Sequence, residues 1–127
     1  MTNMVVAAGD IVRVEVGGEA HVHKGGVAHV WEGGRAFVQK GGIVHVHTGG
    51  WACVLKGGRA NVQEGGEAHV EVGGMAYVYK GGEACVHMGG WAYVEEGGTA
   101  NVLKGGVAHV QKGGLWVATQ GPAEVKG

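Results

Sequence analysis

Serine is missing from this 127-residue chain, and proline, cysteine and aspartate are almost missing. Without serine there is no hydroxyl nucleophile of the serine-hydrolase kind. Two cysteines, Cys53 and Cys85, are too few for a disulfide framework. The one aspartate, Asp10, excludes coils built around repeated calcium sites, because calcium needs many oxygen ligands.

Net charge and long apolar runs are also scarce. A formal charge of −1 predicts no strong attraction to nucleic acid or anionic lipid. No apolar run approaches the roughly 18 residues that span a bilayer, so we expect no membrane insertion. The opening MTNMVVAAGD does not resemble a secretory signal, which leaves the location open. No phosphate-binding loop is found. We expect a protein that is not an enzyme and has no cofactor.

What the chain has is periodic glycine. From Gly17 to Lys112 the octad Gly-Gly-x-Ala-x-Val-x-x runs twelve times, and only Val44 replaces the alanine. Alanine and valine stand two apart, so on a strand they share one face. Paired glycines every eight residues exclude a helix and suit tight corners. Strands this short can bury their valines only by stacking, which predicts an all-β parallel β-helix, or β-solenoid.

The ends depart from the octad. We expect residues 1–16 to form an N-terminal cap with one degenerate octad, residues 17–112 the solenoid, and residues 113–127 a C-terminal cap. Exposed strand edges at the ends of a solenoid invite aggregation unless they are covered. In GGLWVATQ (113–120), Trp116 stands in the alanine position and is predicted to plug the last coil.

The number of octads in one coil is the main open question. With a 24-residue period, the seventh octad position sorts into one apolar and two polar columns, and the apolar column is Trp31, Leu55, Tyr79 and Leu103. This sorting favours a triangular coil of three strands. A two-sided, 16-residue coil stays open, because position three then separates a mostly apolar column from a polar one. An intertwined trimer, as in phage tail needles, is the third possibility.

The triangular coil predicts one exposed aromatic-aliphatic face that docks a partner. Large exposed apolar patches are typical of interfaces. The partner would be a second copy, a fibre protein or a carbohydrate. The residues expected to bind it are Val27, Trp31, Trp51, Leu55, Met75, Tyr77, Tyr79 and Leu103.

A second face of that coil gathers five of the eight histidines, which gives an alternative function as a histidine-rich metal-binding repeat protein. Imidazoles on neighbouring strands could share a zinc or nickel ion. The candidates are His21, His23, His45, His47 and His69. Cys53 and Cys85 fall on different faces of a triangular coil, so neither a disulfide nor a Cys–His–Cys site is expected.

The stretch GGVAHVWEGGRAFVQKGG (25–42) resembles the Gly-Gly repeats of AIDA-type autotransporter adhesin passengers. Similar repeats occur in phage tail fibres. The resemblance covers roughly residues 9–120 and implies a right-handed β-helix with an adhesive role, without assigning functional residues. Together with the apolar face, it favours a non-enzymatic structural or adhesive module.

Overall fold

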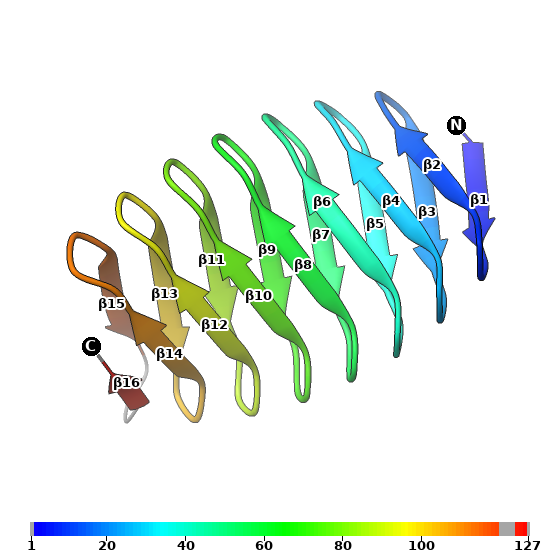
Figure 1. The fold of residues 1–127 in the computed structure, drawn as a ribbon. Helices are drawn as coiled ribbons and strands as arrows, with labels where there is room; N and C mark the ends of the chain where they lie inside the picture. The colour runs from blue at the N-terminus through cyan, green and yellow to red at the C-terminus, as the bar shows by residue number, and fades with distance from the viewer. Residues whose placement is uncertain (1, 120–123, 127) are drawn as a thin grey trace.

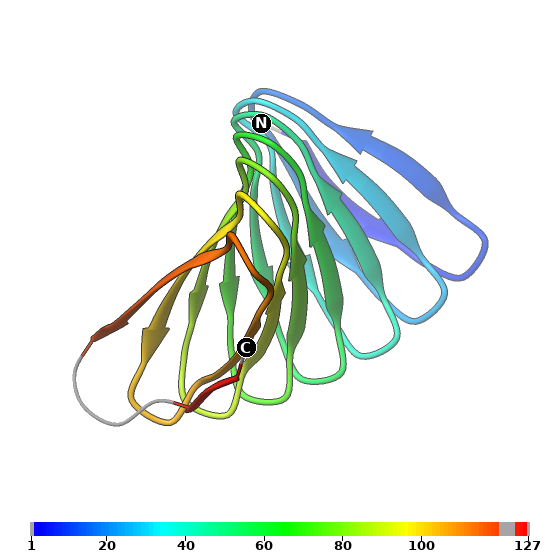
Figure 2. The same ribbon diagram turned by 60° about the vertical axis from the view of Figure 1, so that its left-hand side comes forward.

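The protein is a two-layered stack of short β-strands (Figures 1 and 2). The computed structural model describes residues 2–119 and 124–126, with side chains described for residues 5–116. Every secondary-structure element in these ranges is a strand, and all strand pairs are parallel. Within the same ranges there is no helix of a kind that could cross a bilayer. The predicted all-β parallel β-solenoid is therefore confirmed.

The strands alternate between two parallel sheets, each of eight strands. Sheet A contains β1 (Thr2–Val6), β3 (Gly18–Val22), β5 (Arg35–Val38), β7 (Trp51–Val54), β9 (Glu67–Val70), β11 (Glu83–Val86), β13 (Thr99–Leu103) and β15 (Leu115–Thr119). Sheet B contains β2 (Ile11–Val14), β4 (Val27–Val30), β6 (Ile43–Val46), β8 (Arg59–Val62), β10 (Met75–Val78), β12 (Trp91–Val94), β14 (Val107–Val110) and β16 (Glu124–Lys126).

One coil contains two strands and 16 residues, so the predicted triangular 24-residue coil is wrong and the two-sided alternative is right. Each strand pairs with the strand two places along, as when β8 sets Ala60 opposite Ala76 and Val62 opposite Val78 of β10. The ladders join strands of one chain, so the structure is not an intertwined trimer.

The corners explain the two-sided shape, because each is a four-residue turn that reverses the chain. In the turn 31–34 the amide of Gly34 donates to the carbonyl of Trp31 at 2.8 Å, and Gly33 has a φ of +79°. A positive φ at the third turn residue is the mark of a type II turn and favours glycine. Two reversals close a coil, whereas three strands would need wider corners.

The second glycine of each pair serves a different purpose, which is close approach to the neighbouring coil. A Cβ built on Gly34 would lie 2.6 Å from the carbonyl oxygen of Val14, and one on Gly66 would lie 2.7 Å from that of Val46. Only a hydrogen atom fits in these gaps. The sequence suggested that both glycines serve the corner conformation. The structure shows that the second glycine is needed for close packing of neighbouring coils.

The core between the sheets consists of the inward alanines and valines. Val62 and Val86 are fully buried, as are the alanine and valine of nearly every other octad. Val44 fills an alanine position and is also fully buried. The inward direction of both residue types, predicted from their spacing of two, is confirmed.

The two ends continue the same ladders. β1 pairs with β3 and β2 with β4 in the register of the internal coils. Trp116 of β15 stands opposite Ala100 in the inward column, yet 47% of its surface is exposed. The described residues therefore do not enclose its ring as the predicted plug requires. Pro122 lies outside the described residues, and the capping role of both ends stays a prediction.

Candidate docking surface

Among the described side chains that point outward, the outer face of sheet B carries most of the aromatic and aliphatic ones. Its outward residues form three columns that run across the strands. The first column is Ile11, Val27, Ile43, Arg59, Met75, Trp91 and Val107. The second column is Arg13, His29, His45, Asn61, Tyr77, Tyr93 and His109. The third, which follows the strands, is Glu15, Trp31, His47, Gln63, Tyr79, Glu95 and Gln111. We call this face the sheet B surface.

Aromatic rings stack along the second column at the strand spacing. The rings of Tyr77 and Tyr93 lie 5.1 Å apart, and those of Tyr93 and His109 lie 4.9 Å apart, each pair within 15° of parallel. Trp91 stands beside them with its ring 5.4 Å from that of His109. Rings held this way by a rigid ladder form a flat, preorganised surface.

A second group of rings lies over β4 and β6. The rings of Trp31 and His47 stack at 4.0 Å, and those of His29 and His45 stack at 4.8 Å. Nδ1 of His29 and Nε2 of His47 are 3.3 Å apart, a hydrogen bond whose donor depends on the tautomer. Asn61 adds a contact to His45.

Burial lowers the pKa of His45 and His47 below their ordinary value of 6.5, and the neighbouring His29 lowers both further. The unfolded chain therefore binds protons more readily than the folded chain below about pH 6.5. We expect the free energy of unfolding to fall as the pH drops through this region and to gain nothing from these groups above it.

The pH effect can be measured by urea unfolding between pH 8 and pH 5.5. In the His45→Gln/His47→Gln double variant the loss of stability toward pH 5.5 should be smaller than in wild type. The control is His23→Gln, because His23 is exposed on the opposite sheet. Equal pH profiles for wild type and the double variant would contradict the prediction.

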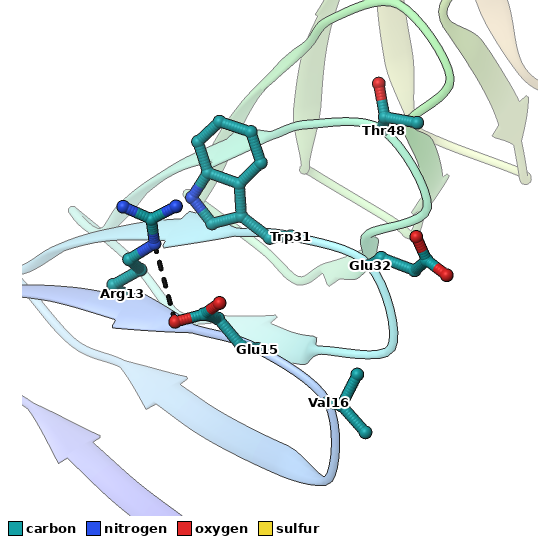
Figure 3. A pocket seen from close by; sticks show the side chains of 6 residues that line it. All are labelled: Arg13, Glu15, Val16, Trp31, Glu32 and Thr48. Carbon is teal, nitrogen blue, oxygen red and sulfur yellow. Dashed lines mark ion pairs between the residues drawn. The ribbon is translucent and has the colours of Figure 1, made fainter.

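An open hollow lies at the N-terminal end of the sheet B surface (Figure 3). It is lined by Arg13, Glu15, Val16, Trp31, Glu32 and Thr48. The Arg13 guanidinium lies 4.8 Å from the centre of the Trp31 ring, and its Nε is 3.5 Å from an oxygen of Glu15. The hollow thus combines one indole ring with charged groups and a hydroxyl.

The outer face of sheet A has a different character. Among its described side chains it carries four carboxylates, from Glu19, Glu67, Glu71 and Glu83, against one guanidinium, Arg35. The sheet B surface has two carboxylates and two guanidinium groups. At neutral pH sheet A is therefore acidic outside, whereas the sheet B surface is neutral.

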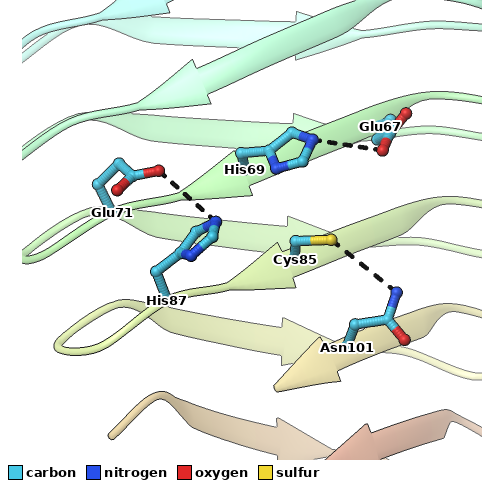
Figure 4. Close-up of polar contacts among 6 residues, drawn as sticks. All are labelled: Glu67, His69, Glu71, Cys85, His87 and Asn101. Atoms are coloured by element: carbon cyan, nitrogen blue, oxygen red, sulfur yellow. Dashed lines mark hydrogen bonds and ion pairs between the residues drawn. The ribbon is translucent and has the colours of Figure 1, made fainter. Parts of the chain in front are cut away.

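Sheet A also brings together three possible metal ligands (Figure 4). Ligand atoms of Glu67, His69 and Cys85 all lie within 4.8 Å of one another. Burial raises the pKa of the Cys85 thiol, and burial likewise raises that of Cys53. Both cysteines are free and half-buried.

The predicted binding residues do not share one face, because the triangular coil that grouped them is wrong. Trp51, Leu55 and Leu103 lie on sheet A. The other five lie on the sheet B surface: Val27, Trp31, Met75, Tyr77 and Tyr79. Sequence reasoning left out the aromatic residues Trp91 and Tyr93, which the 16-residue spacing of the two-sided alternative would have included.

The five candidate metal-binding histidines are divided in the same way. His21, His23 and His69 belong to sheet A, while His45 and His47 belong to sheet B. Cys53 and Cys85, expected on different faces, instead share one column, and each is in register with His69 between them. The spacing of two octads from Cys53 to His69, and again from His69 to Cys85, was the signal for this arrangement.

The chain is thus a two-sided parallel β-solenoid, and its fold matches solved structures. One is the crystal structure of a TibA fragment, residues 55–350, hyper-glycosylated by TibC. The TM-score is 0.53 at 27% sequence identity, and the match covers 98% of this chain and 60% of the fragment. At the level of the fold, the match supports the β-solenoid resemblance seen in the repeats. No family model and no curated protein matches the sequence.

Hyper-glycosylation of the TibA fragment has little counterpart in this sequence. Glycans are attached to hydroxyl groups or to asparagine in Asn-x-Ser/Thr. The chain has no serine and no such asparagine motif, and Thr48 and Thr99 are the threonines among its described side chains.

Proposed function

We propose that the chain is a non-enzymatic structural or adhesive module that associates with a second copy through the sheet B surface. The observation that carries the proposal is the concentration of aromatic and aliphatic side chains on this one face, in two groups on either side of the polar residues Arg59, Asn61 and Gln63. Trp91 is 40% exposed and Tyr79 is 39% exposed. Aromatic residues and methionine are enriched at protein interfaces, and patches of this kind are seldom left bare on monomers.

Charge favours a second copy as the partner. The sheet B surface has equal numbers of acidic and basic groups, so two such faces meet without net repulsion. Two sheet A faces would each bring an excess of carboxylates and would repel. A symmetric dimer uses the same patch on both copies, which suits a face that is neutral and repetitive.

The size of the face predicts weak association. The seven strands from β2 to β14 at ~4.8 Å, with three outward columns that span five residues at ~3.3 Å, give roughly 550 Å² per copy, or about 1,100 Å² in total. Specific interfaces begin at about 1,000 Å², and stable ones bury about 1,600 Å². A dimer in the micromolar range is therefore expected.

The test is the self-association of the Trp91→Ser/Tyr79→Ser variant. These are the most exposed aromatic side chains of the described sheet B surface, so their loss should disturb the fold least. We expect dimerisation at least tenfold weaker than in wild type, measured by sedimentation equilibrium or light scattering over a concentration series. Hot-spot aromatic residues commonly contribute this much.

The matched control is Phe37→Ser/Trp51→Ser, which removes two aromatic rings from sheet A. This variant should associate as wild type does. Wild type that stays monomeric at high micromolar concentration, or a control that loses association equally, would overturn the proposal.

A carbohydrate is the second candidate partner, favoured by the hollow at Trp31. Aromatic rings offer a flat apolar face to sugars, and the neighbouring Arg13, Glu15 and Thr48 supply hydrogen-bonding groups. Oligosaccharide binding would change the fluorescence of wild type, and the change would be lost in Trp31→Ser but kept in Trp51→Ser. Retention in Trp31→Ser would exclude the hollow as the sugar site.

A further inference from the structure

The column Cys53–His69–Cys85 on sheet A is chemically unlike the rest of the surface. Cys53 on β7, His69 on β9 and Cys85 on β11 occupy equivalent positions on consecutive strands, about 4.8 Å apart. Glu67, two residues before His69, points to the same side of β9. Nε2 of His69 is 3.3 Å from Oε2 of Glu67.

Glu67, His69 and Cys85 provide oxygen, nitrogen and sulfur donors within 4.8 Å of one another. Tetrahedral ligands bound to zinc at 2.0–2.3 Å lie about 3.4–3.8 Å apart, so small side-chain rotations would bring the three donors together. A thiolate and an imidazole select zinc over calcium or magnesium, which prefer oxygen alone.

We propose that Glu67, His69 and Cys85 form a zinc site with three protein ligands and a water molecule in the fourth position. Its surroundings favour a cation. Glu83 stands in register with Glu67, and Glu71 lies 3.7 Å from the ring nitrogen of His87. The ring of Trp51, 5.2 Å from that of His69, covers one side of the site. Asn101, whose amide contacts the Cys85 sulfur, lies on the other side.

A second Glu–His pair in the same chain can be compared with this site. Residues 17–22 repeat the sequence GGEAHV of residues 65–70, and Glu19 and His21 form the same pair at 3.4 Å. The next strand places Phe37 beside His21, where Cys85 stands beside His69. The first pair therefore lacks the sulfur ligand, and only the second is expected to bind zinc.

The test is calorimetric titration of the full chain with zinc chloride under reducing conditions. Wild type should bind one ion. Cys85→Ser and His69→Gln should each weaken binding at least tenfold, while His21→Gln and Cys53→Ser should leave it unchanged. Cobalt chloride should give a sulfur-to-metal charge-transfer absorption that Cys85→Ser abolishes, a signal that a purely structural role for Cys85 would not produce.

A second measurement uses the wild-type chain alone and does not depend on the folding of any variant. Zinc should slow alkylation of Cys85 by iodoacetamide at least tenfold and leave the rate at Cys53 unchanged, as read by mass spectrometry. Absence of zinc binding, binding that survives Cys85→Ser, or equal protection of both cysteines would each overturn the proposal. None of these results bears on the sheet B surface.

Discussion

Replacing Val62 with aspartate should lower the free energy of unfolding by at least about 4 kcal/mol. Val62 lies on β8 in the middle of the stack and is fully buried between the two sheets. The inward residues around it are alanines and valines, which offer a carboxylate no hydrogen bond. Urea unfolding followed by circular dichroism measures the loss, which should be smaller at pH 5 than at pH 8 because the neutral acid is less costly to bury.

The adjacent residue provides the control. Asn61 points outward from the same strand, half-buried beside His45, so Asn61→Asp adds the same charge to the opposite face. We expect a change of less than about 1 kcal/mol there. Similar losses for the two variants would mean that the inward and outward assignment of β8 is wrong.

Replacing Gly66 with alanine should destabilise the protein by at least about 3 kcal/mol. The new methyl carbon would lie 2.7 Å from the carbonyl oxygen of Val46 and 2.9 Å from its Cγ1. Backbone atoms of the neighbouring coil cannot move aside without breaking the ladder between β6 and β8. The midpoint of urea unfolding measures this effect as well.

Gly18 and Gly17 separate steric clash from backbone strain. At Gly18, also a second glycine, a Cβ would lie 3.1 Å from Glu15 O, so Gly18→Ala should cost far less than Gly66→Ala. Gly17 has a φ of +79° and open space around its Cβ position, so Gly17→Ala should show only the strain of about 1–2 kcal/mol. If Gly66→Ala is as stable as wild type, neighbouring coils are not stacked as closely as the structure places them.

The sequence was sufficient to predict the strand unit and its inward face. Alanine and valine two residues apart can be buried together only on an extended strand, and the glycine pair marks every corner. Both predictions depend on backbone geometry and burial, which act on every octad alike. Fully buried Val44 shows that the alanine position tolerates one larger side chain where the sheets leave room.

The number of strands per coil was wrongly predicted as three, because it was judged from outward side chains. Residues such as Trp31 and Leu55 face solvent and need not match along a column, so their apolar character was not evidence of adjacency. The type II turn with its first glycine at positive φ decides the period instead, since it reverses the chain.

The candidate sites were grouped wrongly for the same reason, because their grouping assumed 24 residues per coil instead of 16. A spacing of two octads places Tyr77, Tyr93 and His109 in one stacked column and Cys53, His69 and Cys85 in another. A spacing of three octads separates every one of these neighbours. The sequence pointed to Tyr77 and His69 but not to Tyr93 or Cys85, because neighbours across the sheet could not be assigned until the coil length was known.

Because successive octads alternate between the sheets, the length of this protein can change cleanly only by an even number of them. Removing a pair, such as residues 57–72, would leave every remaining strand on its own side and merely shorten the stack. Removing one octad would transfer all later strands to the opposite side, so that Tyr77 and Tyr93 would continue the acidic face and His69 and Cys85 the aromatic one. Octads can therefore be gained or lost only in pairs if both faces are to be kept, even though a single octad is the smallest unit that the chain repeats.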